Sequence, residues 1–221
     1  MQGKIDEVFK DSKMLTNLTI FFLYAYSLLS IINMGFGINE LIIWKNVENG
    51  LIFESEALVS VALYSEYQLV NNYFGVFTLL ISLILVLTWI YKANKNARSL
   101  GTENMKFTPV WSISWYFIPF FNLIRPYQAM KELYQTSVNS HDWKNVNSTK
   151  ILPYWWTAWL LTLFISTRSV NGESVSEYIN QALIWASSSF FEFLSGVLLA
   201  IIIKKIYDNQ LKLYKSKMLS V

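Results

Sequence analysis

Three long, mainly apolar stretches constrain the fold of this chain more than any other feature of its sequence. They run from Leu15 to Gly35, from Tyr73 to Tyr91 and from Gln181 to Ile203. A helix of about 20 apolar residues crosses the roughly 30 Å hydrocarbon core of a bilayer. Only 15% of the residues are charged, against about 25% in a typical soluble protein. The sequence therefore predicts an all-α integral membrane protein.

A fourth apolar stretch, 152–168, is shorter than the other three. It contains Trp155, Trp156 and Trp159, which suit a membrane interface, and it ends at Arg168, whose long side chain can reach the headgroups. We therefore expect a four-helix transmembrane bundle with spans of about 15–35, 73–91, 152–168 and 181–203. The expected organisation is a cytoplasmic N-terminal segment, one transmembrane domain and a basic cytoplasmic tail, at 1–14, 15–207 and 208–221.

The distribution of Lys and Arg predicts the orientation. The connections 37–72 and 169–180 contain one basic residue, Lys45, whereas 92–150 contains eight. Because basic residues are retained on the cytoplasmic side, both termini and the middle connection are expected there, next to the anionic headgroups of the lipid bilayer. The connection 37–72 is partly apolar and rich in glutamate, so we expect a helix that lies on the outer membrane surface or on the neighbouring helices.

The middle connection contains an aromatic and proline-rich segment, 107–133, which begins FTPVWSISWYFIPFFNL. It is too apolar for a plain loop, yet both of its flanks are basic. Pro109, Pro119 and Pro126 interrupt helical hydrogen bonding, so an unbroken spanning helix is not expected. Two alternatives stay open: an interfacial segment in the inner leaflet, which we favour, and a re-entrant hairpin covered by other helices.

A longer pattern surrounds this segment. WIYKANKNARSLG at 89–101 is followed by Pro109, Trp111, Trp115, Pro119 and Asn122, then by RPYQAMKEL at 125–133 and by the tryptophans of the fourth stretch. This pattern resembles a family of bacterial membrane proteins catalogued as domain of unknown function 4328. The resemblance implies a small helical domain in the bacterial inner membrane and supplies no activity.

The residues of this cytoplasmic signature have structural interpretations. We expect a helix that passes Asn96 and ends at a Gly101 cap, and turns fixed by Pro109 and Pro119. Asn122 is expected to form a cap or an Asx-turn before the helix that starts near Arg125 and Pro126. Trp111 and Trp115 are expected at the headgroup boundary.

Polar side chains also occur within the spans. Those singled out are Glu192, Ser188, Ser195, Asn33 and Arg168. Glu192 lies near the middle of the last span, where facing lipid would cost about 2.5–3.5 kcal/mol for a charged residue. Two interpretations stay open: a carboxyl group bonded inside the bundle, with Ser188, Ser195, Thr78 or Ser82 as partners, or a hydrated carboxylate lining a cavity.

The sequence offers no constellation typical of catalysis. It has no cysteine and a single histidine, His141, in a polar stretch, so no metal or cofactor is expected. The leading hypothesis is a homo-oligomer that forms or gates a pore or perturbs the membrane, without an enzymatic activity. The alternative is a membrane anchor or accessory subunit of a soluble enzyme or an antiviral defence system, with a cytoplasmic protein partner and no direct nucleic-acid contact. A lipid-modifying enzyme is the third hypothesis.

Overall fold

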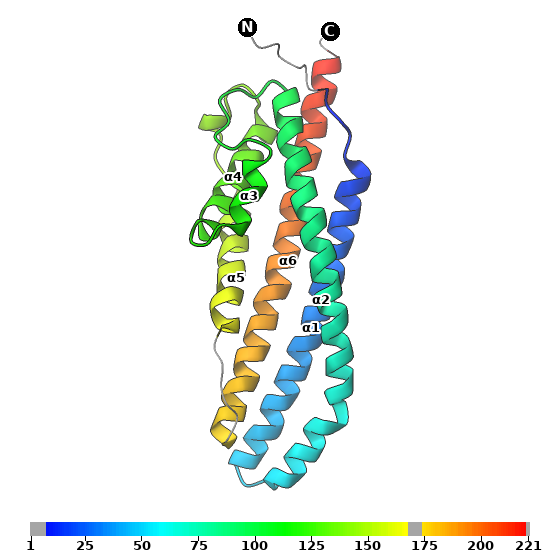
Figure 1. Ribbon diagram of the computed structural model, residues 1–221, viewed down its shortest axis with the longest axis vertical. Coiled ribbons are helices and arrows are strands. Elements are labelled where there is room, and N and C mark those ends of the chain that lie inside the picture. The colour runs from blue at the N-terminus through cyan, green and yellow to red at the C-terminus, as the bar shows by residue number, and fades with distance from the viewer. Residues whose placement is uncertain (1–7, 168–173, 220–221) are drawn as a thin grey trace. The chain divides into compact units, whose positions relative to one another are not determined.

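The computed structural model describes residues 8–167 and 174–219, and these residues form helices and turns without any strand (Figure 1). Their α-helices, in chain order, are α1 (Lys13–Glu48), α2 (Glu54–Ser99), α3 (Trp111–Ser114), α4 (Arg125–Val138), α5 (Ile151–Ser166) and α6 (Val175–Met218). Short 3-10 helices occupy Trp115–Phe117, Phe121–Leu123 and Trp143–Asn145.

Three of these helices, α1, α2 and α6, are long and apolar enough to cross a membrane, and the described residues confirm the all-helical fold. Their 36, 46 and 44 residues correspond to about 54, 69 and 66 Å at 1.5 Å per residue, well beyond a bilayer core of roughly 30 Å. The fourth apolar helix, α5, has 16 residues.

The expectation of a separate surface helix within 37–72 is wrong. Instead α1 continues to Glu48, α2 begins at Glu54, and only a five-residue turn joins them. The reason lies in a few apolar residues of this region that are buried in the fold, although others, such as Phe53 and Leu63, are exposed. Trp44, Ala57 and Ile179 form a buried core, and the Trp44 ring stacks on Tyr178 at 4.1 Å between ring centroids.

The chain folds into two compact units, and each long helix contributes to both. Unit 1 comprises 1–22, 81–156 and 198–221, and unit 2 comprises 23–80 and 157–197. Within unit 1 the end of α6 lies beside the end of α2 (Figure 1), where Gln210 Nε2 donates to the carbonyl of Ala93 at 2.9 Å. The described residues after 207, which were expected as a separate tail, are the last turns of α6.

The residues just before α1 are also held in unit 1. Asn96 bonds to both backbone groups of Lys10, since it accepts from the amide at 3.1 Å and donates to the carbonyl at 2.9 Å. Phe9 stacks on Tyr214, and the Tyr207 hydroxyl donates to Asp11. Asn96 thus ties α2 to the segment that leads into α1.

The aromatic segment contains no unbroken helix, in agreement with its prolines. α3 ends at Ser114, and two 3-10 turns follow around an extended residue, Ile118. Between them Phe120 adopts φ +63°, and the amide of Phe121 donates back to the carbonyl of Pro119 at 2.8 Å. A bulky residue in this left-handed region is strained by about 1–2 kcal/mol.

Candidate functional site

Unit 2 contains a cleft of about 460 Å³ that is lined by both polar and apolar side chains. Its walls come from α1, α2, α6 and the end of α5, and most of the side chains in them are polar. The polar members are Tyr26, Asn33, Asn72, Ser166, Gln181, Ser188, Ser189 and Glu192. The apolar walls include Val76, Leu79, Ile184 and Trp185.

Helical spacing brings these side chains to one place. On α6, Gln181, Ser188 and Glu192 are separated by seven and four residues, which places them along one helical face. On α1, Tyr26 and Asn33 are also seven residues apart. From Gln181 to Glu192 the polar wall extends about 16 Å along α6, at 1.5 Å per residue.

Glu192 lies at one end of this polar wall. The Ser30 hydroxyl donates to its Oε2 at 3.3 Å, and the Tyr26 hydroxyl is its second hydrogen-bonding neighbour. Both partners come from α1, whereas two of the expected partners, Ser188 and Thr78, donate to backbone carbonyls of their own helices. Glu192 thus has features of both interpretations drawn from the sequence: it is hydrogen-bonded inside the bundle, and it lines a cleft.

Two close approaches of α1 and α6 flank the cleft. A side chain on Gly37 would meet the backbone nitrogen of Ala186 at 2.9 Å, and one on Gly196 would collide with the hydroxyl of Ser27. Such close packing of small residues is typical of helix pairs in lipid. It fixes the distance between the two helices that carry Glu192 and its partners.

The second polar link in unit 2 joins α1 to α2. Asn71 Nδ2 donates to Asn33 Oδ1 at 2.6 Å and to the carbonyl of Leu29 at 3.2 Å, while the next residue, Asn72, faces the cleft. The sequence interpretation missed both Asn71 and Asn72 because it placed them in a connection outside the membrane. Asn71 lies seven residues before Thr78, so both fall on nearly the same face of a helix. Extending the polar face of the second span by two turns would have included Asn71 and Asn72.

The remaining polar residues expected in the spans do not join this site. Ser195 is buried and does not line the cleft. Arg168 lies outside the residues that the structure describes.

In unit 1 polar side chains of α2 and α4 build a closed network around the loop that follows α2. The carbonyl of Phe107 accepts from Asn94 Nδ2 at 3.0 Å and from a guanidinium nitrogen of Arg98 at 3.1 Å. The Glu132 carboxyl group accepts from the backbone amides of Lys106 and Phe107 at 2.8 and 3.1 Å. These contacts clamp the loop after α2 between α2 and α4.

Burial raises the pKa of Glu132 above its ordinary value, although the two amides and the charges of Arg98 and Lys106 act in the opposite direction. The sequence interpretation singled out neither Asn94 nor Glu132, and it counted Arg98 only among the basic residues expected near the headgroups. The spacing of these three residues in the sequence does not predict that they meet. Asn94 and Glu132 are joined through the backbone of Phe107, so the loop geometry must be known first.

The end of α2 has the geometry expected for a glycine cap. Gly101 has φ +79°, its amide donates to the carbonyl of Arg98, and the amide of Thr102 donates to the carbonyl of Ala97. These two bonds define a Schellman motif. Lys217 Nζ adds a bond of 2.6 Å to the carbonyl of Leu100.

The start of α4 differs from expectation. Its N-cap position is Ile124, without a side-chain cap, so the capping role expected for Asn122 is wrong. Pro126 lies in the first turn, as expected, because its fixed φ suits that position and its missing amide costs nothing there. Pro109 and Pro119 lie just before α3 and just before the strained turn at Phe120, where they limit helix extension.

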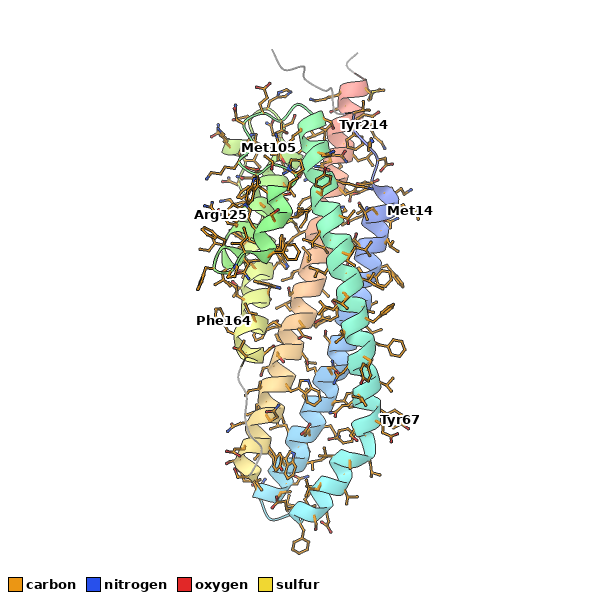
Figure 2. The ribbon with its side chains drawn as sticks, in the orientation of Figure 1. Met14, Tyr67, Met105, Arg125, Phe164 and Tyr214 are labelled. Carbon is orange, nitrogen blue, oxygen red and sulfur yellow. The ribbon has the colours of Figure 1, made fainter. Side chains whose placement is uncertain are left out.

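The aromatic side chains gather around Arg125. The rings of Trp111 and Trp115 are 4.9 Å apart, and the guanidinium carbon of Arg125 lies 5.5 Å from the Trp115 ring and 5.9 Å from the Phe121 ring. Figure 2 labels Arg125, the first residue of α4. The buried hydroxyl of Tyr116 in the same segment has no hydrogen-bond partner among the described residues.

Among residues 8–167 and 174–219, no three His, Cys, Asp or Glu side chains are grouped in a way that could hold a metal ion. The chemistry available in the cleft is that of one carboxyl group with hydroxyl and amide side chains. Such a set binds water and small cations through oxygen atoms.

Comparisons with known proteins give one match. No curated protein and no solved structure matches the chain. A family described as Domain of unknown function (DUF4328) matches residues 56–208, which is more than half of the chain and includes the loop clamp, the aromatic segment and Glu192. The chain therefore belongs to the DUF4328 family.

Proposed function

We propose that this protein is a non-enzymatic, multi-pass membrane protein that forms a pore for small cations, with the cleft of unit 2 as the path and Glu192 as its selective group. The observation that carries the proposal is the polar lining of the cleft inside helices that are otherwise apolar. Eleven residues of α6 separate Gln181 from Glu192, and about 16 Å of rise is roughly half of a bilayer core.

Membrane placement is the first part of the proposal. α1, α2 and α6 span the bacterial inner membrane, and α5 is the fourth span. Both termini and the basic connection 92–150 lie in the cytoplasm, because Lys and Arg are concentrated there. The aromatic segment lies in the inner leaflet, since its large apolar side chains are exposed while its flanks are basic.

A hydrated carboxyl group suits cation passage. Inside a bilayer a polar wall is costly unless water or a partner reaches it, and intramembrane acids commonly mark ion pathways. Ser30 and Tyr26 hold Glu192 at one side, which leaves the other side facing the cleft. Because the cleft covers only about half of the bilayer core, we propose that a second copy of the chain completes the path.

Liposome flux tests the pore. Purified wild-type protein and Glu192→Gln should be compared in potassium-loaded liposomes, with assembly size measured in parallel. The matched control is Glu66→Gln, which makes the same chemical change at an exposed residue of α2 in unit 2, away from the cleft. We expect wild type and the control to conduct equally and Glu192→Gln to conduct at least tenfold less at unchanged assembly size. Wild-type flux no faster than that of protein-free liposomes contradicts the pore and favours the anchor hypothesis.

Cysteine labelling tests the orientation. The chain has no native cysteine, so a single introduced thiol reports one position. Asn49→Cys, in the turn between α1 and α2, should react with a membrane-impermeant reagent on intact cells. His141→Cys should react only after permeabilisation. Reaction of His141→Cys on intact cells would mean that the aromatic segment crosses the membrane and would overturn the proposed topology.

A further inference from the structure

Unit 1 has an exposed apolar surface that the proposed pore does not use. It is formed by the aromatic segment and consists of Val110, Trp111, Phe117, Phe120, Phe121 and Ile124, each of which is at least 48% exposed. Phe120 is the most exposed of the six, at 85%, and lies in the strained turn. We call this surface the aromatic wedge.

The positively charged side chain of Arg125 lies at the aromatic wedge and is held in place by its neighbours. The guanidinium of Arg125 lies over the faces of Trp115 and Phe121, and its Nη1 donates to Gln128 Oε1 at 3.0 Å. No carboxylate of the described residues forms an ion pair with it. Arg125 is therefore held by three neighbours, and most of its five N–H donors have no acceptor within the described part of the chain.

We propose that Arg125 and the aromatic wedge form a binding site for the phosphate of an anionic phospholipid, with the acyl chains packed against the wedge. Planar guanidinium groups bind phosphate oxygens in pairs. Because the aromatic rings already restrict the Arg125 side chain, it loses less conformational entropy when it binds a phosphate. The neighbouring side chains are apolar and exposed, which suits a lipid and does not suit a free phosphate ion.

The occupant is a lipid for two reasons. First, six exposed apolar side chains within 15 residues would be unfavourable in water, and the same chain contains three helices apolar enough to span a membrane. Second, the strained backbone at Phe120 directs a large aromatic side chain outward, and burial of that side chain in an acyl layer offsets the strain.

Native mass spectrometry of the purified full chain tests the site, with phosphatidylglycerol and phosphatidylcholine added as competing lipids. We expect wild type to retain phosphatidylglycerol preferentially, and Arg125→Gln to lose about fivefold in that preference, the effect of one basic residue at a membrane surface. Arg125→Lys, which keeps the charge without the planar fork, should retain part of it.

The matched control is Lys144→Gln, because Lys144 also lies over a tryptophan ring in unit 1, at 5.6 Å from the centroid of Trp143, and is not part of the wedge. Circular dichroism verifies that each variant is folded. An unchanged preference in folded Arg125→Gln overturns the proposal, and so does an equal loss in Lys144→Gln. Loss of lipid preference on addition of millimolar inorganic phosphate would mean that the site takes the free ion, which also contradicts a lipid site.

The proposal rests on the inner-leaflet placement of the segment, and a separate measurement tests that placement. Brominated phosphatidylcholine should quench the fluorescence of Trp111 and Trp115. Their share is the difference in quenching between wild type and a double variant with Trp111→Phe and Trp115→Phe. Failure here would contradict the placement, whereas failure of the lipid preference with intact quenching would contradict only the Arg125 site. Neither result depends on ion flux through the cleft.

Discussion

The two units use buried polar side chains in opposite ways. In unit 1, Asn94, Arg98 and Glu132 bond to the loop at Lys106 and Phe107 with distances of 2.8 to 3.1 Å. In unit 2, Glu192 accepts a bond of 3.3 Å from Ser30, has Tyr26 as its second hydrogen-bonding neighbour, and shares a cleft wall with other polar side chains. The network in unit 1 is closed, whereas the group in unit 2 is open on one side.

This difference separates stability from function. Removing a member of a closed network leaves buried donors without partners and costs the full desolvation of those groups. Removing a group that faces a cleft costs less, because water can replace it. We therefore expect substitutions in unit 1 to lower stability and substitutions in the cleft to change flux with little change in stability.

The largest effect is expected for Glu132→Ala. The change leaves the amides of Lys106 and Phe107 buried without an acceptor, so the free energy of unfolding should fall by about 2–4 kcal/mol. Denaturant titration in detergent micelles measures this, and faster hydrogen exchange at the two amides localises it. Glu66→Ala, at an exposed position of α2, is the control and should change stability by less than about 0.5 kcal/mol. Equal stability of the two variants would contradict a structural role for the clamp.

The second effect concerns accessibility within α6. Ser188 and Ser195 lie on the same helix and are similarly buried, at 7% and 8% exposed, yet only Ser188 lines the cleft. In the cysteine-free chain, Ser188→Cys should react with a small charged thiol reagent at least tenfold faster than Ser195→Cys. Mass measurement over time gives both rates. Similar rates would mean that the cleft is not hydrated.

The apolar stretches predicted three long helices, and the glycine cap at Gly101 was predicted from its place after WIYKANKNARSL. The lengths of α1 and α2 were not predicted, because hydropathy marks only the part of a helix that lies in lipid. Trp44 and Ala57 belong to a helical core beyond that part, and their apolar spacing was taken for a surface segment.

The two sites differ in how far the sequence revealed them. Glu192 was identified because an acid in the middle of an apolar helix is costly wherever it lies. Its partners Ser30 and Tyr26 depend on how α1 packs against α6, which the sequence does not specify. The clamp residues were missed for a different reason, since Glu132 binds backbone amides and any loop sequence can supply those.

A pair of glycine substitutions gives a smaller effect. Gly50 and Gly101 both have a positive φ, +70° and +79°, so alanine at either position should cost about 1–2 kcal/mol in backbone strain. Only at Gly101 would the new methyl group also approach Lys217 Nζ, at 3.1 Å, and disturb its bond to Leu100. Gly101→Ala should therefore be less stable than Gly50→Ala by about 0.5–1.5 kcal/mol in denaturant titration. The opposite order would show that Lys217 contributes nothing at this turn.

The smallest expected effect is a pH dependence of stability that originates in Glu132. Burial raises the pKa of this carboxyl group above the ordinary 4.5, so the folded protein binds its proton more tightly than the unfolded chain does. The stability from this proton is fully present below the unfolded pKa and is lost as the pH rises through the folded pKa. Stability should thus fall in wild type as the pH rises above about 4.5, relative to Glu132→Gln, which has no proton to lose.

Denaturant titrations at half-unit pH steps measure the difference between wild type and Glu132→Gln, which cancels the contributions of the other carboxyl groups. The substituted amide side chain presents one oxygen and one nitrogen to two backbone donors, so the variant should be less stable at every pH while lacking this slope. Glu66→Gln should keep the wild-type slope. A difference that stays constant with pH, or one in which wild type gains stability as the pH rises, would mean that interactions with Arg98, Lys106 and the two amides outweigh burial at this carboxyl group.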